Sequence, residues 1–222
     1  MGYLSFNIQI KDKSVVIIGG GSVAERKVSN ILSSGARLTV ISPTLTYTLQ
    51  SLRDNGRIQH VPRRYEDGDL EGAFIVIAAT DDHDVNLDVA REAEKLKILV
   101  EVTDNAAAGN ITSPAIVRQG DLSIAISTNN KAPSLSAAIK RELGRVYGPE
   151  YAKTTRLLGV IREKLLTDGA GSTYNKRVLS DLAENLPELF AADAVAEINR
   201  LLQKHFGEGC TLATFESAIE DP

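Results

Sequence analysis

Three glycines near the start of the chain have the spacing of a dinucleotide-binding turn. Gly19 and Gly21 follow the apolar run SVVII and complete, with Ala24, the pattern G-x-G-x-x-A. In this pattern Gly19 permits a tight turn out of a strand, Gly21 lets the backbone approach a pyrophosphate, and Ala24 keeps the next helix close to the sheet. A helix that begins near Ser22 would direct unpaired N–H groups at the phosphates. The turn is therefore predicted to bind the pyrophosphate of NAD or NADP; a glycine turn that serves packing alone is the alternative.

The residues that would hold the adenine ribose differ from the usual pattern. That pattern has an acid about 20 residues after the glycines, whereas this chain has Ser42, Pro43 and Thr44 there. A hydroxyl of Ser42 or Thr44 can hydrogen-bond a ribose hydroxyl, but it does not repel a 2′-phosphate. No arginine follows immediately to attract a 2′-phosphate either. We therefore predict NAD as the cofactor, with NADP as the alternative.

Strands and helices that alternate along the chain surround the turn and would position it. Apolar, β-branched runs predict strands, and apolar residues three and four apart predict helices. The expected strands are 14–19, 37–42, 57–61, 73–80 and 98–104, and the expected helices are 22–34, 48–56 and 82–95. Strands separated by helices imply right-handed crossovers, so the predicted fold class is α/β, a Rossmann-type doubly wound parallel sheet. Thr80 and Asp104 end two of its strands, at the edge where such sheets bind ligands.

The second half of the chain has a different pattern. Two short strands predict an antiparallel hairpin over 115–128, and a helix follows from Pro133. Further helices are expected over 151–166, 174–186 and 193–207, the last with Asp193 as N-cap and Gly207 as stop. The predicted domains are a Rossmann domain (1–113), a hairpin-plus-helix segment (114–148) and a small all-α domain (149–222). A hairpin and one amphipathic helix bury little by themselves, so a symmetric partner chain is expected to cover them.

Composition excludes several classes of protein. The chain has 222 residues, of which 43% are hydrophobic and 24% charged, as in an ordinary soluble globular protein. Its net charge of −4 argues against nucleic acid as a partner, and its single cysteine, Cys210, allows neither an internal disulfide nor a thiolate metal site. No run approaches the roughly 18 apolar residues of a membrane span, and the start has no pattern of a secretory signal. We therefore expect a cytoplasmic protein without membrane association.

The acidic run ATDDHDVN (79–86) raises the question of a metal site, because it gathers aspartates and His83 within a few positions. Asp81 or Asp82 is also well placed to cap the helix expected there, and acids are favourable in the first turn of a helix. His60 and His205 lie far apart in the sequence and have no ligand spacing. We therefore predict a capped helix start and no metal ligands.

Longer motifs resemble one family of enzymes. GGGSVAERK (19–27), GARLTVISP (35–43), IAATDDHDVN (77–86) and the stretch from VEVTDN to AAIKREL (100–143) are closely similar, in order and spacing, to the siroheme-synthase dehydrogenase family. The similarity covers about residues 1–147. These enzymes are precorrin-2 dehydrogenases, and some also act as sirohydrochlorin ferrochelatases. The resemblance implies NAD-dependent oxidation of precorrin-2 to sirohydrochlorin in siroheme biosynthesis, with insertion of Fe²⁺ or Co²⁺ left open.

The resemblance also implies an assembly and a place among related enzymes. In the family, the segment that corresponds to 114–148 interlocks with a second subunit, so a homodimer is expected. The fused members carry a C-terminal methyltransferase module that makes precorrin-2. This chain resembles the stand-alone form, which would receive precorrin-2 from another enzyme.

The same resemblance also implies roles for particular residues. Asp104 corresponds to the family's catalytic carboxylate and would take a proton; the alternative is an aspartate that caps local backbone N–H groups. Thr80 is expected on the nicotinamide side. The family positions that touch the dinucleotide correspond to Ser22, Val23, Pro43 and Thr44.

Candidates for the substrate site lie later in the chain. A tetrapyrrole of this type carries many carboxylates, so its site needs cations or backbone donors. Lys131, Lys140, Arg141 and Arg145 are the local candidates, with a solvated helix face as the alternative. Thr128 keeps a hydroxyl in the stretch STNN (127–130), where the fused enzymes often have SSGG. Asparagine tolerates left-handed backbone, so the turn is expected to survive this difference.

Two other functions compete with a precorrin-2 dehydrogenase. A non-catalytic, NAD-sensing regulatory protein would bind NAD but would need neither the carboxylate of Asp104 nor an anion-binding surface. A general small-molecule dehydrogenase is disfavoured because the later half has no Ser/Tyr/Lys or histidine-based catalytic set. The sequence favours the precorrin-2 dehydrogenase.

Overall fold

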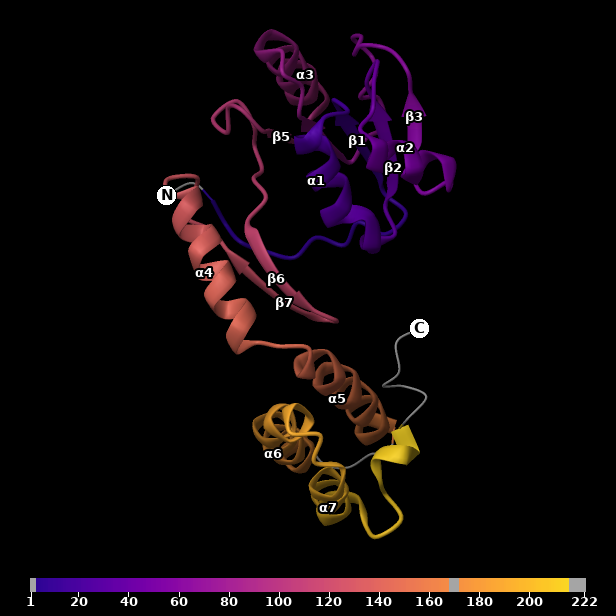
Figure 1. Cartoon of the computed structure of the whole chain (residues 1–222), viewed down its shortest axis with the longest axis vertical. Helices are drawn as coiled ribbons and strands as arrows, with labels where there is room; N and C mark the ends of the chain where they lie inside the picture. Colours follow the sequence, from indigo (N-terminus) through magenta and orange to yellow (C-terminus); the bar gives the residue numbers. More distant parts are fainter. Residues whose placement is uncertain (1–2, 168–171, 216–222) are drawn as a thin grey trace. The chain divides into compact units, whose positions relative to one another are not determined.

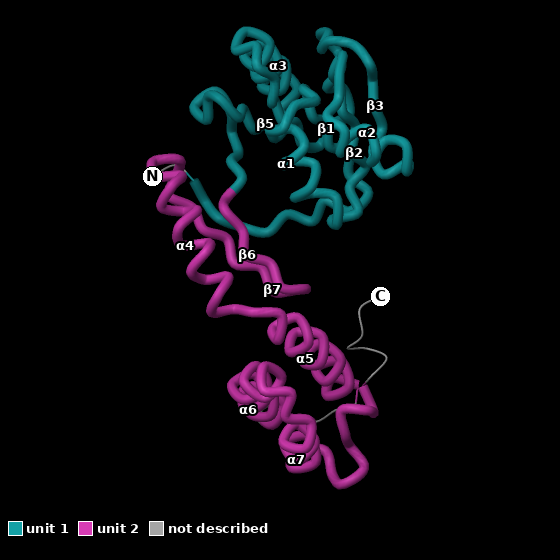
Figure 2. The backbone as a smooth tube through the Cα atoms, viewed as in Figure 1, with its two compact units in different colours: residues 1–113 teal, residues 114–222 magenta. Residues whose placement is uncertain are grey.

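The computed structural model describes residues 3–167 and 172–215, and the chain divides into two compact units. Unit 1 spans residues 1–113 and unit 2 spans residues 114–222 (Figure 2). Each unit has a hydrophobic core of its own and is described by itself. The predicted division into three domains, with a further boundary after residue 148, stays a prediction.

Unit 1 contains a five-stranded parallel sheet. Its strands are β1 (Ser14–Ile18), β2 (Arg37–Ile41), β3 (Gln59–Val61), β4 (Ile75–Ala78) and β5 (Leu99–Val102). They lie in the order β3-β2-β1-β4-β5, and every neighbouring pair is parallel (Figure 1). The chain moves outward from β1 to β3 and then crosses to β4 on the other side of β1, which is the topology of a doubly wound sheet. The predicted fold class is confirmed.

Helices cover both faces of this sheet. They are α1 (Ser22–Ile31), followed by a 3₁₀ turn (Leu32–Ser34), α2 (Tyr47–Asp54) and α3 (His83–Leu96). Side chains alternate along β1, so Val16 and Ile18 join the core beneath α3, while Val15 and Ile17 join the core beneath α1 and α2. A strand with two buried faces is apolar at every position, which explains the run SVVII.

A buried ion pair connects α1 to β5. Lys27 Nζ lies 2.7 Å from Glu101 Oε1, and both side chains are buried. Ser113, at the end of the unit, donates its backbone N–H and its hydroxyl to the same carboxylate at 2.9 and 2.6 Å. A buried charge is costly unless it is paired and hydrogen-bonded. These contacts therefore make Lys27 and Glu101 compatible with the core, and they hold residue 113 against β5.

Unit 2 joins a hairpin to four helices. The hairpin pairs β6 (Ala115–Gln119) with β7 (Leu122–Ile126), as predicted. The helices are α4 (Pro133–Val146), α5 (Glu150–Thr167), α6 (Ser172–Ala191) and α7 (Val195–Phe206), with a 3₁₀ turn at Leu212–Phe215. Buried side chains of the last three helices, such as Leu157, Leu182 and Leu202, form one core. Within the described residues, no helix is long and apolar enough to cross a membrane.

Two helix boundaries in unit 2 differ from the predictions. The predicted N-cap Asp193 has a φ of 51°, and Ala194 occupies the N-cap position of α7. The prediction was wrong because the N–H of Asp193 bonds back to the carbonyl of Phe190, which places Asp193 in the turn that ends α6. α6 also continues through Pro187 to Ala191, beyond its predicted end at 186. Gly207, with a φ of 90°, does end α7 as predicted.

Candidate functional site

The three glycines of the turn occupy different environments. Gly19 has a φ of 116°, and a Cβ there would lie 2.3 Å from the carbonyl oxygen of Ala79. A Cβ on Gly20 would lie 2.0 Å from the carbonyl oxygen of Thr44. A Cβ on Gly21 would meet no atom within 4 Å. The first two glycines are therefore required by packing, whereas Gly21 borders open space.

The start of α1 is available to an anion. Gly21 is its N-cap residue and has no side chain that could satisfy the first N–H groups of the helix. These groups and the positive end of the helix dipole attract phosphate. The space that a side chain at residue 21 would fill is thus the space that a pyrophosphate needs, so the turn fits the dinucleotide that the sequence predicts.

A cavity of about 470 Å³ lies over this turn, at the carboxyl ends of the strands. This volume is within the usual range for sites that bind small molecules and cofactors. Of the predicted cofactor residues, the cavity is lined by Gly19, Gly21, Ser22, Val23, Pro43, Thr44 and Thr80. The eighth, Ala24, is fully buried and packs in the core beneath α1. Its position agrees with the packing task predicted for it and excludes direct contact with a ligand in the cavity.

The structure adds cavity residues that the sequence did not indicate. Arg64 and Tyr65, from the loop that follows β3, line the same cavity as Pro43 and Thr44. The sequence pattern places an arginine for a 2′-phosphate just after β2, whereas Arg64 comes from the loop after the neighbouring strand, β3. Because β3 pairs with β2 in parallel, both strands end at the same edge of the sheet. That pairing is the signal that could have pointed to Arg64.

A buried carboxylate holds this loop in place. Glu92 of α3 accepts a hydrogen bond from the hydroxyl of Tyr65 and, at 3.0 and 3.3 Å, from the backbone N–H groups of Gly68 and Leu70. Burial and the hydrogen bond to Glu92 raise the pKa of Tyr65, so its hydroxyl keeps its proton at neutral pH. Glu92 therefore positions the loop that carries Arg64 and Tyr65 to the cavity.

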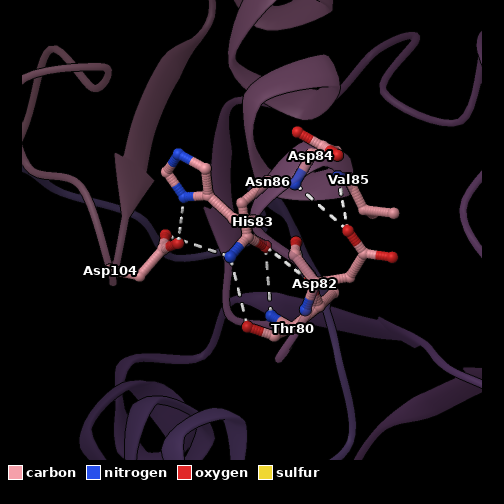
Figure 3. A network of polar contacts seen from close by, with 7 residues as sticks. All are labelled: Thr80, Asp82, His83, Asp84, Val85, Asn86 and Asp104. Atoms are coloured by element: carbon pink, nitrogen blue, oxygen red, sulfur yellow. Dashed lines mark hydrogen bonds and ion pairs between the residues drawn. The ribbon is translucent and has the colours of Figure 1, made fainter.

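A second polar network lies beside the cavity, and Figure 3 shows its members. Asn86, in the first turn of α3, is fully buried. Its Oδ1 accepts from the backbone N–H and the hydroxyl of Thr80 at 3.1 and 2.8 Å, and its Nδ2 donates to the carbonyl of Thr80 and to Asp104 Oδ1 at 3.1 and 3.0 Å. The other carboxylate oxygen of Asp104, Oδ2, lies 2.6 Å from His83 Nδ1. Thr80 on the cavity wall is thus connected through Asn86 to a histidine–aspartate pair.

The two members of this pair shift each other's ionisation. The hydrogen bond to Asp104 raises the pKa of His83, although desolvation opposes it. Desolvation alone would raise the pKa of Asp104, but hydrogen bonds from His83, the backbone and Asn86 outweigh it and lower that pKa. The pair therefore favours a charged carboxylate and a histidine that gains a proton more readily than a free one. The sequence prediction placed Asp104 in the site but did not connect it with His83.

The acidic run before α3 is a helix start, as predicted. Asp82 is the N-cap residue, and its side chain accepts from the backbone N–H groups of Asp84 and Val85. Within residues 3–167 and 172–215, no group of three metal-ligating side chains gathers in one place. His60 bonds to the carbonyl of Ser42, and His205 pairs with Asp181.

The predicted substrate residues all belong to unit 2. Thr128 Oγ1 accepts from the backbone N–H of Ala132 at 3.1 Å, beside the start of α4. Asn129 and Asn130 have φ of 50° and 61°, which confirms that asparagines can maintain the left-handed turn. The four cations, Lys131, Lys140, Arg141 and Arg145, are exposed. Their role in substrate binding stays a prediction.

Comparison with known proteins identifies the class of unit 1. Residues 6–115 match the model of a family described as “Putative NAD(P)-binding”. This range contains the glycine turn, the cavity residues and the pair of His83 and Asp104. Unit 1 is therefore an NAD(P)-binding domain of the Rossmann type.

Relatives of known name cover most of the chain. It is 32% identical over 212 residues to siroheme synthase 1 of Aeromonas salmonicida and 35% identical over 163 residues to siroheme synthase of Methylobacillus flagellatus. These matches cover 94% and 73% of this chain but 45% and 35% of the relatives, so the chain spans less than half the length of both. A solved structure, “SirC, precorrin-2 dehydrogenase”, is 26% identical with a TM-score of 0.69, and the match covers 86% of this chain and 98% of that one. The chain is a homologue of the siroheme synthases, as the resemblance of its motifs indicates.

Proposed function

We propose that the chain is an NAD-dependent dehydrogenase that oxidises precorrin-2 to sirohydrochlorin in siroheme biosynthesis. The observation that carries the proposal is a dinucleotide cavity with a histidine–aspartate pair beside it. A regulatory domain that only senses NAD has no use for such a pair. The homology with siroheme synthases and the structural similarity to a precorrin-2 dehydrogenase support the choice of substrate.

The residues of unit 1 have separate tasks in this reaction. The backbone at Gly21 and Ser22 would hold the pyrophosphate, and Pro43 and Thr44 would contact the adenine ribose. Thr80, on the same cavity wall, lies beside the network that ends in the histidine–aspartate pair. When bound, NAD⁺ supplies an acceptor for a hydride from the reduced macrocycle. The pair beside the cavity supplies a site for the proton that must also leave.

An anaerobic absorbance assay with enzymatically generated precorrin-2 tests the proposal. We expect the sirohydrochlorin spectrum to develop only when NAD⁺ is present. Asp104→Ala should slow the reaction about 100-fold, within the usual contribution of acid–base catalysis. Asp88→Asn is the matched control, because Asp88 is an exposed residue of α3 that pairs with Arg91; this variant should keep the wild-type rate.

The same assay separates the alternatives. A protein that binds NAD⁺ but leaves the spectrum of precorrin-2 unchanged would contradict the enzyme and favour the NAD-sensing regulatory protein. Addition of Fe²⁺ or Co²⁺ after the oxidation tests for metal insertion, which would appear as a second spectral change.

We also propose that the protein acts as a homodimer in the cytoplasm. Leu135 and Val146 on α4 are 53% and 60% exposed, and a symmetric partner would cover such apolar side chains. Sedimentation equilibrium should give twice the chain mass of 23.9 kDa, and Leu135→Asp should shift the mass toward that of one chain. A single-chain mass for the wild type at every concentration would contradict the dimer. Cell fractionation tests the location.

A further inference from the structure

The hydrogen bonds of Asp104 leave its carboxylate poorly placed to act as a base. Oδ2 is occupied by His83 Nδ1 at 2.6 Å, and Oδ1 is occupied by Asn86 Nδ2 at 3.0 Å. The two donors stabilise the charged carboxylate, so its affinity for a further proton is reduced. A neighbouring group with a free basic atom would therefore accept a proton more readily than Asp104.

His83 has the opposite properties. Its Nδ1 faces Asp104, and no described hydrogen bond involves its Nε2. The side chain is 55% exposed, so a substrate can reach the ring. A carboxylate that accepts from Nδ1–H fixes the tautomer in which Nε2 carries a lone pair, and this is how a histidine base is oriented in many enzymes.

The position of the pair is fixed relative to the cofactor cavity. Asn86, which holds Asp104, makes its other bonds to the backbone and hydroxyl of Thr80. Thr80 lines the cavity, and so does Asp82, which directly precedes His83. The residues next to the pair therefore belong to the segment that lines the cofactor cavity. Figure 3 shows His83 and Asp104 close to Thr80 and Asp82.

We propose that His83, through Nε2, is the base that accepts the proton released during the oxidation, and that Asp104 is its positioning residue. The assignment rests on the proposed function. The oxidation transfers a hydride, which is one proton with two electrons, to NAD⁺, which becomes NADH. The second proton goes to Nε2, from which it passes to water. The charges that face the ring are Asp104, Asp82 and Asp84, all negative, and they favour the protonated product state of His83.

Two variants distinguish the base from its positioning residue through the pH profile of kcat. A histidine base must be neutral to accept a proton, so the wild-type kcat should decrease as the pH falls. This decrease is the acid limb of the profile. His83→Gln should lower kcat at neutral pH about 100-fold and remove this acid limb. Asp104→Asn should also lower kcat but keep the limb and move it to lower pH, because the ring loses the carboxylate that raises its pKa. If Asp104 were the base, Asp104→Asn would remove the acid limb, and His83→Gln would keep it but move it to higher pH, because His83 lowers the pKa of Asp104.

A second readout does not depend on turnover. Imidazole NMR titration is practical because the chain has three histidines, and the signal that His83→Gln removes identifies His83. We expect the pKa of His83 to exceed that of free histidine and to fall in Asp104→Asn. Both variants should bind NAD⁺ within about twofold of wild type, with Asp88→Asn as the matched control on the same helix.

The outcomes separate this assignment from the proposed function. Oxidation of precorrin-2 by His83→Gln with an unchanged acid limb would overturn the assignment alone. Failure of the wild-type protein to oxidise precorrin-2 would overturn the proposed function and the assignment with it.

Discussion

At the residue scale, the glycines of the turn differ in whether the fold or the cofactor requires them. Gly19 needs its left-handed backbone, and both Gly19 and Gly20 lie against carbonyl oxygens that leave no room for a Cβ. Gly21 has ordinary extended backbone, with a φ of −85°, and no neighbour within 4 Å of an added Cβ. A methyl group at residue 21 would therefore cost the fold little and would occupy the position of the pyrophosphate.

This difference predicts the behaviour of two variants. Gly21→Ala should fold with a Tm close to that of wild type but bind NAD⁺ about tenfold more weakly, a loss of about 1.4 kcal/mol. Gly19→Ala should be strongly destabilised or fail to accumulate. Thermal unfolding and isothermal titration with NAD⁺ measure the two effects. Wild-type affinity in Gly21→Ala would exclude the turn as the pyrophosphate site.

Arg64 predicts how the site treats NADP⁺. No acid stands at the end of β2 to repel a 2′-phosphate, and a guanidinium on the same cavity wall can attract one. Arg64→Ala should therefore weaken NADP⁺ about tenfold, as expected for the loss of a charged hydrogen bond, while NAD⁺ changes less than about twofold. Competition titrations with the two dinucleotides measure this, with the exposed Arg57→Ala as control. Equal losses for both dinucleotides would show that Arg64 does not face the 2′ position.

Some residues of the site can be found from the sequence and others cannot. The two groups differ in how their contacts arise. The glycine turn acts through consecutive positions, so a local motif describes it fully. His83 and Asp104 are 21 positions apart and meet only because β4 and β5 are neighbours in the sheet. Arg64 and Thr44 line the same cavity for a similar reason, because β2 and β3 are neighbours in the sheet. Such contacts need the strand order, which motifs do not contain.

At the element scale, the loop between β3 and β4 depends on one side chain of α3. Glu92 is buried and accepts bonds from Tyr65, Gly68 and Leu70. Within the loop, the guanidinium of Arg63 binds both carboxylate oxygens of Asp69 at 2.6 and 2.7 Å. The cavity wall formed by this loop is therefore ordered by polar contacts rather than by regular secondary structure.

Removal of Glu92 should destabilise the protein and weaken its cofactor site together. Glu92→Ala leaves several donors without a partner, so we expect a loss of about 2 kcal/mol in the free energy of unfolding and weaker NAD⁺ binding. Glu94→Ala, at an exposed position of the same helix, is the control. Urea unfolding and NAD⁺ titration measure both effects. A stable Glu92→Ala variant with normal NAD⁺ affinity would contradict this role.

Whether the boundary of an element was predicted correctly depends on whether local or tertiary interactions determine it. β1 and β4 were predicted because their two buried faces make them almost continuously apolar, and the start of α3 because Asp82 caps it locally. β3, whose residues are exposed or half-buried, has the weakest pattern of the five strands. The N-cap of α7 was predicted wrongly because the preceding turn is set by the end of α6. The packing of Leu189 and Phe190 against the core keeps the last turn of α6 helical beyond Pro187. These interactions are tertiary and leave no local pattern.

At the scale of the whole molecule, two units with separate cores should respond to different conditions. NAD⁺ binds to unit 1. It stabilises unit 1 and any other part of the chain that unfolds cooperatively with unit 1. In unit 2, Asp181 of α6 lies 2.8 Å from Lys204 Nζ and 2.6 Å from His205 Nε2 of α7. The hydrogen bonds from Lys204 and His205 lower the pKa of Asp181. A lowered pKa stabilises the fold above the unfolded value of about 3.9, and this stabilisation is lost as the pH falls through the folded value.

Calorimetry should therefore resolve two independent effects. At pH 7, NAD⁺ at about 100 times its Kd should add about 2.7 kcal/mol to the transition of unit 1 and leave that of unit 2 unchanged. Asp181→Asn should lower the transition of unit 2 at pH 7, and this effect should diminish as the pH falls below about 3.9. The exposed Glu188→Gln should have no such pH-dependent effect. One transition that both NAD⁺ and Asp181→Asn shift by the same amount would show that the two cores unfold together, and the cofactor would then stabilise the whole chain.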